Sequence, residues 1–198
     1  MSAAQPSPPA RVQDSIRQSG SAQARLFFAL WPEPEIQAEL AQYGRQLQRG
    51  VGGKLTRQES IHLTLVFLGA VDLDRMDDVR GAGGCAEFRP FAFEVDTAGC
   101  WGHNGIAWLG PRLMPEPMLS LVGSLRAALL HAGFRVEQRP YKAHVTVVRK
   151  ARCRPMDPTL APVEWQVNDF VLMRSELNAE GSRYTLIGRW PDASRKPD

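Results

Sequence analysis

Apolar and polar positions alternate along the chain in runs that predict strands and helices in turn. The run RLFFALWP at residues 25–32 is apolar and β-prone and stops at a proline, which predicts a buried strand. From about Pro34 to Gln48, apolar residues recur at helical spacing, and a proline suits the first turn of a helix. We therefore expect a buried strand followed by a surface helix.

The rest of the chain continues this alternation. We expect a helix at Pro115 to Ala132, with Gly133 as its C-terminal cap, and a short or loose helix from Asp72 to about Val79 that the following glycines weaken. The remaining strands are expected at residues 56–68 (ended by Gly69), 91–99, 105–110, 144–148, 163–177 and 182–190, the last two forming a hairpin.

Two of these strands carry related motifs. HLTLVFLG begins at His62 and HVTVVRKA begins at His144, and each places a histidine two residues before a threonine inside an apolar run. One such motif falls in each half of the chain, 82 positions apart, which suggests two similar lobes.

Strand geometry puts the histidine and threonine of each motif on the same face. Side chains at positions i and i+2 of a strand share a face, so His62 projects with Thr64 and His144 with Thr146. The intervening apolar side chains should point into the core; they are Leu63, Leu65, Phe67, Val145 and Val147. Each strand thus presents an imidazole and a hydroxyl about 6.6 Å apart along the backbone.

A single histidine in this setting is usually structural, but its repetition favours chemistry. In-line displacement at phosphorus needs one group that removes a proton and another, across the phosphorus, that delivers one. Histidine suits both roles because its usual pKa lies near neutrality. The threonine hydroxyls and a nearby cation would then bind the non-bridging oxygens.

Other chemistries lack their signatures. We find no HD, HxH or HExxH metal motif, no GxSxG and no GxxxxGK phosphate loop, so we expect neither a metal nor another cofactor. The three cysteines are widely spaced, and we expect them to be buried small apolar residues rather than a disulfide framework or a zinc site.

The paired motifs, with LFFAL before the first and AWLG and RSEL in register, are similar to those of the 2H phosphoesterases. Within these, the chain resembles the bacterial RNA 2′,3′-cyclic phosphodiesterases, also named 2′-5′ RNA ligases. The resemblance implies an α+β, bilobal fold, with two pseudo-symmetric antiparallel sheets facing across a central cleft and helices outside. It also implies metal-independent hydrolysis of RNA 2′,3′-cyclic phosphate ends to 2′-phosphates, with reversible 2′-5′ joining of RNA in some members.

The resemblance assigns roles to particular residues. His62 and His144 would be catalytic, with His62 protonating the departing O3′ and His144 activating water, although the reverse assignment stays open. Thr64, Thr146 and Arg149 would bind the phosphate. Lys150 or Arg139 could assist, since all three cations belong to a basic stretch around the second motif.

Two other readings remain. The chain could be a non-catalytic module that binds RNA or phosphate, or a phosphodiesterase acting on small cyclic nucleotides or 2′-5′ oligonucleotides. We expect one domain at residues 25–190, a disordered extension at 1–24 and a flexible tail at 191–198. The start of the chain lacks a secretory signal pattern and no long apolar run is present, so we expect a cytoplasmic monomer that does not enter a membrane.

Overall fold

The computed structural model describes residues 22–155, 159–178 and 181–191. The expected extension at residues 1–24 and tail at 191–198 fall almost entirely outside this part of the chain. The first strand begins at Gln23, slightly before the start that the sequence predicted.

Strands make up most of the described structure, with three α-helices among the described residues. The strands are β1 (Gln23–Leu30), β2 (Lys54–Leu55), β3 (Leu63–Asp72), β4 (Phe91–Trp101), β5 (Ile106–Gly110), β6 (Val145–Arg149), β7 (Thr159–Val167), β8 (Phe170–Asn178) and β9 (Gly181–Trp190). The helices are α1 (Pro34–Val51), α2 (Met76–Gly84) and α3 (Glu116–His131), with 3-10 turns η1 (Gln58–Ser60) and η2 (Leu73–Arg75).

The strands form two antiparallel halves that meet at one point. The order is β7-β4-β5-β6 in one half and β3-β1-β8-β9 in the other, with β2 beside β6. A single residue pair, Leu63 with Val145, joins β3 to β6 and makes one nine-stranded sheet. This arrangement confirms the predicted α+β fold of two related halves, and the joining residues directly follow the two motif histidines.

The two halves repeat one unit of strand, helix and motif strand. In the first unit β1 leads through α1 to β3, and Leu30 pairs with Leu63. In the second unit β5 leads through α3 to β6, and Leu109 pairs with Val145. An apolar strand therefore lies antiparallel to each motif strand and fixes its start.

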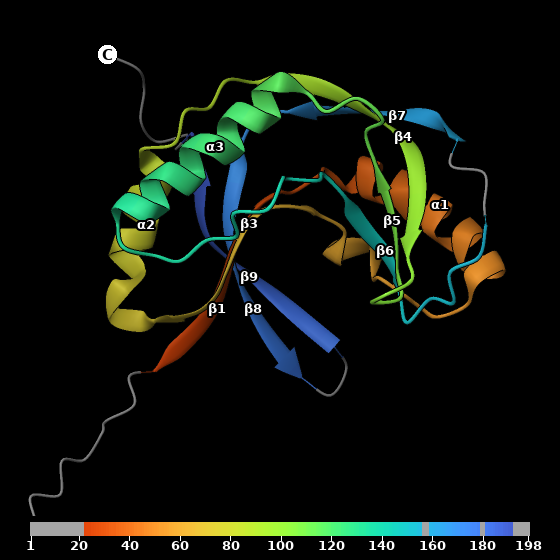
Figure 1. The fold of residues 1–198 in the computed structure, drawn as a ribbon, viewed down its shortest axis with the longest axis horizontal. Helices are drawn as coiled ribbons and strands as arrows, with labels where there is room; N and C mark the ends of the chain where they lie inside the picture. The colour runs from red at the N-terminus through yellow and green to blue at the C-terminus, as the bar shows by residue number, and fades with distance from the viewer. Residues whose placement is uncertain (1–21, 156–158, 179–180, 192–198) are drawn as a thin grey trace, which may run out of the picture.

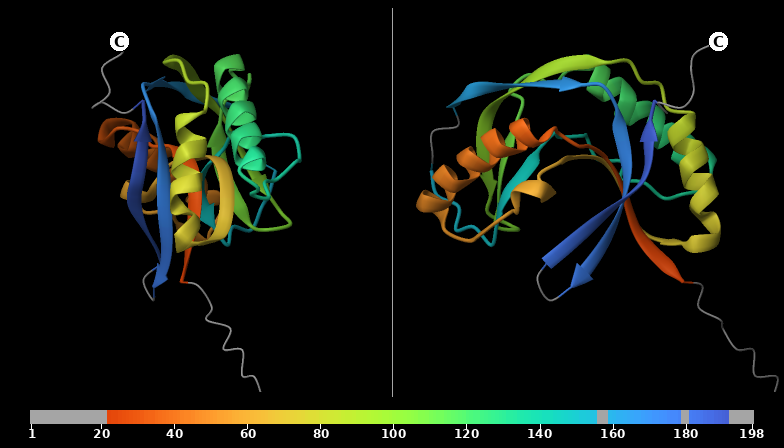
Figure 2. Two further views of the ribbon diagram at one scale, coloured as in Figure 1. Left: turned by 90° about the vertical axis from the view of Figure 1, so that its left-hand side faces the viewer. Right: turned by 180° about the vertical axis from the view of Figure 1, so that it is seen from behind.

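The helices tie the halves together. Helix α1, which belongs to the first unit, packs against β5, β6 and β7 of the other half, while α3 of the second unit contacts β3 and α2. Figures 1 and 2 show this exchange, with α1 beside the β4–β7 group and α2 and α3 at the opposite end of the molecule. The main core cluster accordingly runs through both halves, from Phe28 and Leu63 to Val145 and Trp165.

Several strand predictions were wrong in detail. The strand expected at residues 56–68 begins only at Leu63, after the 3-10 turn Gln58–Ser60. Residues 163–177 form two strands rather than one, because the chain turns at Asn168 and Asp169 and crosses from β4 to β1. Gly69 does not end β3: it adopts a φ of 74° at a bulge opposite β1, and the strand continues to Asp72. Near that bulge the alternation breaks, so Phe67 is 49% exposed instead of buried.

The weak helix after β3 is longer than its glycines suggested. Helix α2 runs through Gly81 and Gly83 to Gly84, with Gly83 against the indole of Trp190. A Cβ at Gly83 would lie 2.7 Å from the Trp190 ring, so this glycine permits close packing of the helix on β9. Tertiary contact thus outweighs a low helix propensity.

The expectation for the cysteines was also wrong. Cys100, at the end of β4, and Cys153, after β6, form a disulfide with a Cα–Cα separation of 5.5 Å. Cys85 is free but exposed rather than buried. The two cysteines are 53 positions apart in the sequence. They meet because β4 pairs with β5 and β5 pairs with β6.

Candidate active site

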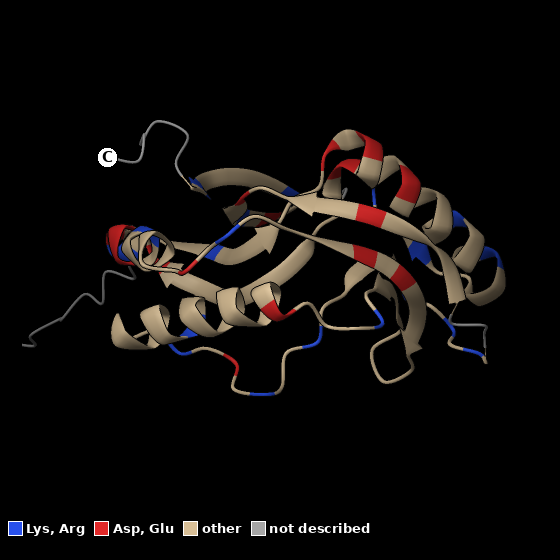
Figure 3. Cartoon of the chain, turned by 90° about the horizontal axis from the view of Figure 1, so that it is seen from above, with Lys and Arg blue, Asp and Glu red and all other residues tan. Residues whose placement is uncertain are grey.

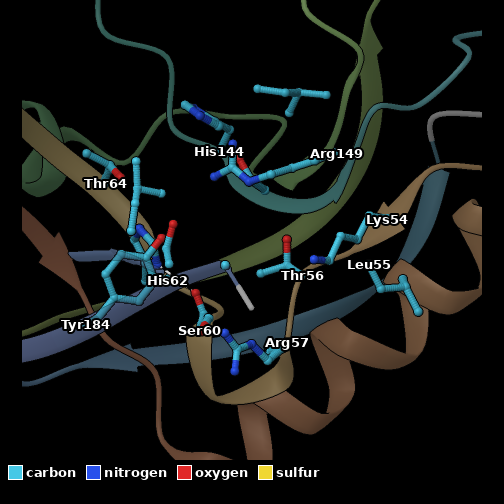
Figure 4. A pocket seen from close by; sticks show the side chains of 15 residues that line it. Lys54, Leu55, Thr56, Arg57, Ser60, His62, Thr64, His144, Arg149 and Tyr184 are labelled. Carbon is cyan, nitrogen blue, oxygen red and sulfur yellow. Dashed lines mark hydrogen bonds between the residues drawn. The ribbon is translucent and has the colours of Figure 1, made fainter. Parts of the chain in front are cut away.

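A cleft of about 320 Å³ lies where the two halves meet. All five site residues that the sequence predicted line this cleft: His62, Thr64, His144, Thr146 and Arg149. Figure 4 shows side chains from both halves entering it, with His62 and Thr64 at one side and His144 and Arg149 at another. The predicted sharing of a face by each histidine and its threonine therefore holds.

Each histidine is held by the same backbone contact. The Nδ1 of His62 lies 2.8 Å from the carbonyl oxygen of Ser60, and the Nδ1 of His144 lies 2.9 Å from that of Lys142. A carbonyl oxygen only accepts, so Nδ1 carries the hydrogen in both rings. In the neutral state Nε2 is then the basic nitrogen, which prepares either ring to accept a proton.

Aromatic rings enclose His62. Trp31 stacks on the imidazole with a centroid distance of 5.1 Å and an interplanar angle of 2°. Phe27 lies 5.0 Å away and Tyr184 meets the ring edge-on at 5.2 Å. Phe27 belongs to β1, Trp31 is the residue directly after β1, and Tyr184 belongs to β9. The hairpin of β8 and β9 therefore completes the enclosure.

The surroundings of His144 are more open than those of His62. Trp101, at the end of β4, meets its ring edge-on at 4.6 Å. The ammonium of Lys142 lies over the rings of Trp108 and Trp101, at 4.9 and 5.7 Å from their centroids. One indole therefore contacts each histidine, but only His62 is surrounded.

Burial shifts both imidazoles toward the neutral form. The pKa of His62 is lowered from 6.5 to about 4, mainly by desolvation, with smaller contributions from the positive charge of Arg149 and from His144, and the hydrogen bond that Nδ1 donates to the Ser60 carbonyl partly opposes this shift. Desolvation also lowers the pKa of His144, helped by Arg149 and Lys142. Both rings are therefore mainly neutral at pH 7 until an anion enters the cleft.

The cleft holds anion-binding groups that the sequence did not single out. Lys54, Thr56 and Arg57 line it from the segment before the first motif. The Oγ1 of Thr56 is buried and has no hydrogen-bond partner among the described residues, so it is available to a ligand. The sequence does show two cations and a threonine close together, in KLTR at residues 54–57. Their place beside Arg149, however, depends on the pairing of β2 with β6.

The two cations named as possible helpers lie elsewhere. Arg139 forms a two-pronged ion pair with Glu137, at 2.6 and 2.9 Å, and does not line this cleft. Lys150 follows β6 with a φ of 57° and is also absent from the lining. Among the described residues, Arg149, Lys54 and Arg57 supply the positive charge of the cleft.

Among the described residues, no three side chains of histidine, cysteine, aspartate or glutamate gather where they could hold a metal ion. None of the helices in that part of the chain combines the length and apolarity needed to cross a membrane.

A repeated strand–helix–strand unit that places two HxT motifs on facing walls of one cleft defines the class of two-histidine phosphoesterases. Comparison with known sequences agrees: the LigT like Phosphoesterase family matches residues 30–108 and again 109–184, one histidine motif in each match. The chain belongs to this family. The double match also supports the two similar lobes that the motif spacing suggested.

Individual relatives carry one recurring name. The chain is 28% identical to the RNA 2′,3′-cyclic phosphodiesterase of Escherichia coli, over 84% of this chain and 95% of that protein. It is 29% identical to the protein of the same name from Thermus thermophilus, over 84% and 89%. The crystal structure of E. coli LigT complexed with 3′-AMP superposes with a TM-score of 0.78 at 28% identity, covering 85% of this chain and 98% of that one.

Proposed function

We propose that this protein is an RNA 2′,3′-cyclic phosphodiesterase, a hydrolase that opens the cyclic phosphate at an RNA 3′ end to give a 2′-phosphate and a free 3′-hydroxyl. The observation that carries the proposal is the pair of motif histidines, held in the same tautomer by matching backbone contacts, on two walls of one cleft. The names of the relatives support the same reaction.

The reaction needs two proton transfers around one displacement. The Nε2 of one histidine takes a proton from water as its oxygen bonds to phosphorus. The phosphorus–O3′ bond breaks on the far side, and the other histidine, protonated, gives its proton to O3′. The two rings end with their protonation states exchanged, and exchange with solvent restores them, so the cycle consumes only water and needs no cofactor.

The remaining lining groups would bind the phosphate. Thr64, Thr146 and Arg149 face the cleft and offer donors to the non-bridging oxygens, where negative charge grows in the transition state. Thr56 adds a buried, unsatisfied hydroxyl. A bound phosphate also favours protonated histidine, which offsets the low pKa values of the empty cleft.

The surroundings of the two rings favour one division of labour. Burial lowers the pKa of His62 strongly, to about 4, and three aromatic rings enclose it, whereas His144 contacts the one indole of Trp101; this enclosure disfavours a proton on His62. We therefore propose His144 as the acid and His62 as the base, the assignment that the sequence left as the alternative. Trp31 and Phe27 would hold the base in place.

The test is turnover of an RNA oligonucleotide that ends in a 2′,3′-cyclic phosphate. We expect His62→Ala and His144→Ala each to lower kcat by about 100-fold to 10,000-fold, because each removes one proton transfer. His131→Ala is the matched control, since His131 lies at the end of α3 and lines none of the described pockets. Wild-type rates in both cleft variants would refute the proposal.

A chelator provides a companion measurement. We expect activity to persist in EDTA, because the mechanism uses only protein side chains and water. Loss of activity on chelation, restored by a divalent cation, would instead indicate metal-assisted hydrolysis.

The other readings make different predictions in the same assay. A pure binding module would retain the RNA without turnover, and its affinity would fall with salt. Comparing the cyclic-phosphate RNA with a small cyclic nucleotide and a 2′-5′ oligonucleotide ranks the substrates, and joining of RNA halves would reveal the ligase reaction. We propose that the protein acts as a monomer in the cytoplasm. Sedimentation would test the monomer, and cell fractionation would test the location.

A further inference from the structure

A second hollow, of about 390 Å³, adjoins the catalytic cleft. The two share Thr64 and His144 as a common wall, so a ligand in one lies next to a ligand in the other. The hollow is built from β3, the end of β4, α3 and the segment between α3 and β6. The proposed reaction does not use its other lining residues.

The hollow carries more positive than negative charge: Arg126, Arg139 and Lys142 line it with one carboxylate, Glu137. Arg126 reaches it from α3, and its Nε is buried with no hydrogen-bond partner among the described residues. Lys142 is exposed at the rim. Arg139 and Glu137 neutralise each other, which leaves Arg126 and Lys142 as the charges open to a ligand.

The distribution of charge around the hollow is local. Figure 3 shows a mostly uncharged α3 with a single basic band, and several basic positions with one acidic position in the segment that follows it. The basic residues of that segment that line the hollow are Arg139 and Lys142.

The hollow also exposes aromatic surface. Phe67, on the first motif strand, is 49% exposed, and the guanidinium of Arg25 lies 5.2 Å from its ring centroid. Tyr141 lines the same hollow and donates a hydrogen bond of 2.9 Å to the carbonyl oxygen of Thr64. This bond fixes the wall between the two spaces. An exposed phenylalanine beside unpaired cations is typical of sites that stack nucleobases.

We propose that this hollow binds the nucleotide that adjoins the cyclic-phosphate end of an RNA strand, with Arg126 on the internucleotide phosphate and the base stacked on Phe67. The inference rests on the proposed function and narrows its substrate to strands of two or more nucleotides. Binding there holds the reacting end against His144, so its energy contributes to turnover of the longer substrate only.

The test compares a cyclic mononucleotide with a dinucleotide that has the same cyclic-phosphate end. We expect the wild-type protein to favour the dinucleotide in kcat/KM by on the order of tenfold or more. Arg126→Gln should lower this preference by on the order of tenfold and Phe67→Leu by several-fold, while Arg126→Lys retains part of it. Increasing salt should reduce the preference in the wild-type protein more than in Arg126→Gln.

Arg45→Gln is the matched control, because Arg45 is exposed on α1 and lines none of the described pockets. Circular dichroism would check that each variant is folded. Equal kcat/KM on the two substrates in the wild-type protein, or an unchanged preference in folded Arg126→Gln and Phe67→Leu, would overturn the inference.

Binding of the reaction products separates this inference from the proposed function. Calorimetry with the 2′-phosphorylated mononucleotide and dinucleotide gives the same preference without turnover. A protein that hydrolyses neither substrate but binds the dinucleotide more tightly through Arg126 would refute the phosphodiesterase and keep the subsite. A protein that hydrolyses both equally and binds both equally would do the reverse.

Discussion

At the scale of single residues, the two motif histidines are chemically alike in sequence and unlike in their surroundings. Both donate Nδ1–H to a carbonyl two residues earlier, at 2.8 and 2.9 Å. His62 is enclosed by Trp31, Phe27 and Tyr184, whereas Trp101 is the one aromatic ring among the described residues that contacts His144. A pseudo-symmetric fold therefore yields two rings of unequal proton affinity, which is what an acid and a base require.

The low pKa of His62 predicts how stability depends on pH. Its pKa is about 4 in the folded protein and near 6.5 when unfolded, so between these values the unfolded chain binds the proton more readily. The protonation of His62 does not change the free energy of unfolding above pH 6.5. As the pH drops toward 4, it lowers the free energy of unfolding by up to about 3 kcal/mol. Urea unfolding of wild type and of non-titrating His62→Asn from pH 7 to 4 measures the difference.

NMR provides the direct control for that measurement. The His62 ring should titrate near pH 4, and the His144 ring below its usual pKa. A His62 ring that titrates near 6.5, or a variant with the same pH dependence as the wild type, would contradict both the enclosure and the proposed assignment of His62 as base.

The sequence was sufficient to predict five of the side chains that line the cleft. Two HxT motifs in apolar runs predicted which side chains share a face, and all five predicted residues line the cleft. Thr56 and Lys54 were missed, since their place beside Arg149 depends on the pairing of β2 with β6, about 95 positions further along. Nothing in the local pattern specifies such a pair.

At the scale of elements, the glycines of α2 show how packing overrides propensity. Gly83 lies against Trp190, where a Cβ would be 2.7 Å from the ring, whereas Gly81 in the same helix has no atom within 4 Å of that position. The sequence predicted a weakened helix because helix propensity assigns every glycine the same cost. In the structure one of them is a contact and another faces open space.

This contrast predicts opposite effects of the same substitution. Gly83→Ala should destabilise the protein by about 1–3 kcal/mol, because the methyl group collides with a packed indole. Gly81→Ala should stabilise it by about 0.5–1 kcal/mol, because alanine is the better helix former and the site is open. Denaturant unfolding of the two variants checks the signs, and equal effects would show that α2 does not pack closely on Trp190.

At the scale of the whole molecule, the halves are interdependent. Helix α1 covers β5, β6 and β7, whereas α3 contacts β3 in the other half. The chain also leaves the first of these halves after β7 and adds β8 and β9 beside β1. Because α1 and α3 each pack on strands of the opposite half, the two halves are expected to unfold together.

We therefore expect a single unfolding transition that the disulfide shifts as a whole. A loop of 53 positions closed by Cys100 and Cys153 predicts a stabilisation of up to about 4 kcal/mol from the lost entropy of the unfolded chain. Guanidinium unfolding followed by tryptophan fluorescence and circular dichroism should give coincident curves, displaced to lower denaturant by a reductant or by Cys100→Ser. Cys85→Ser is the control, since Cys85 is free and exposed. Separate transitions for the two signals would refute the interdependence.

The sequence by itself determined most strands and helices of each unit and the motif residues that face the cleft, because the periods of strands and helices are local and a repeated motif is visible in one dimension. Tertiary structure alone decided that residues 163–177 divide between the two halves, that Cys100 meets Cys153, and that rings from β1 and β9 enclose His62. These contacts join residues far apart in the chain, and they form only when long-range strand pairing buries apolar surface across both halves.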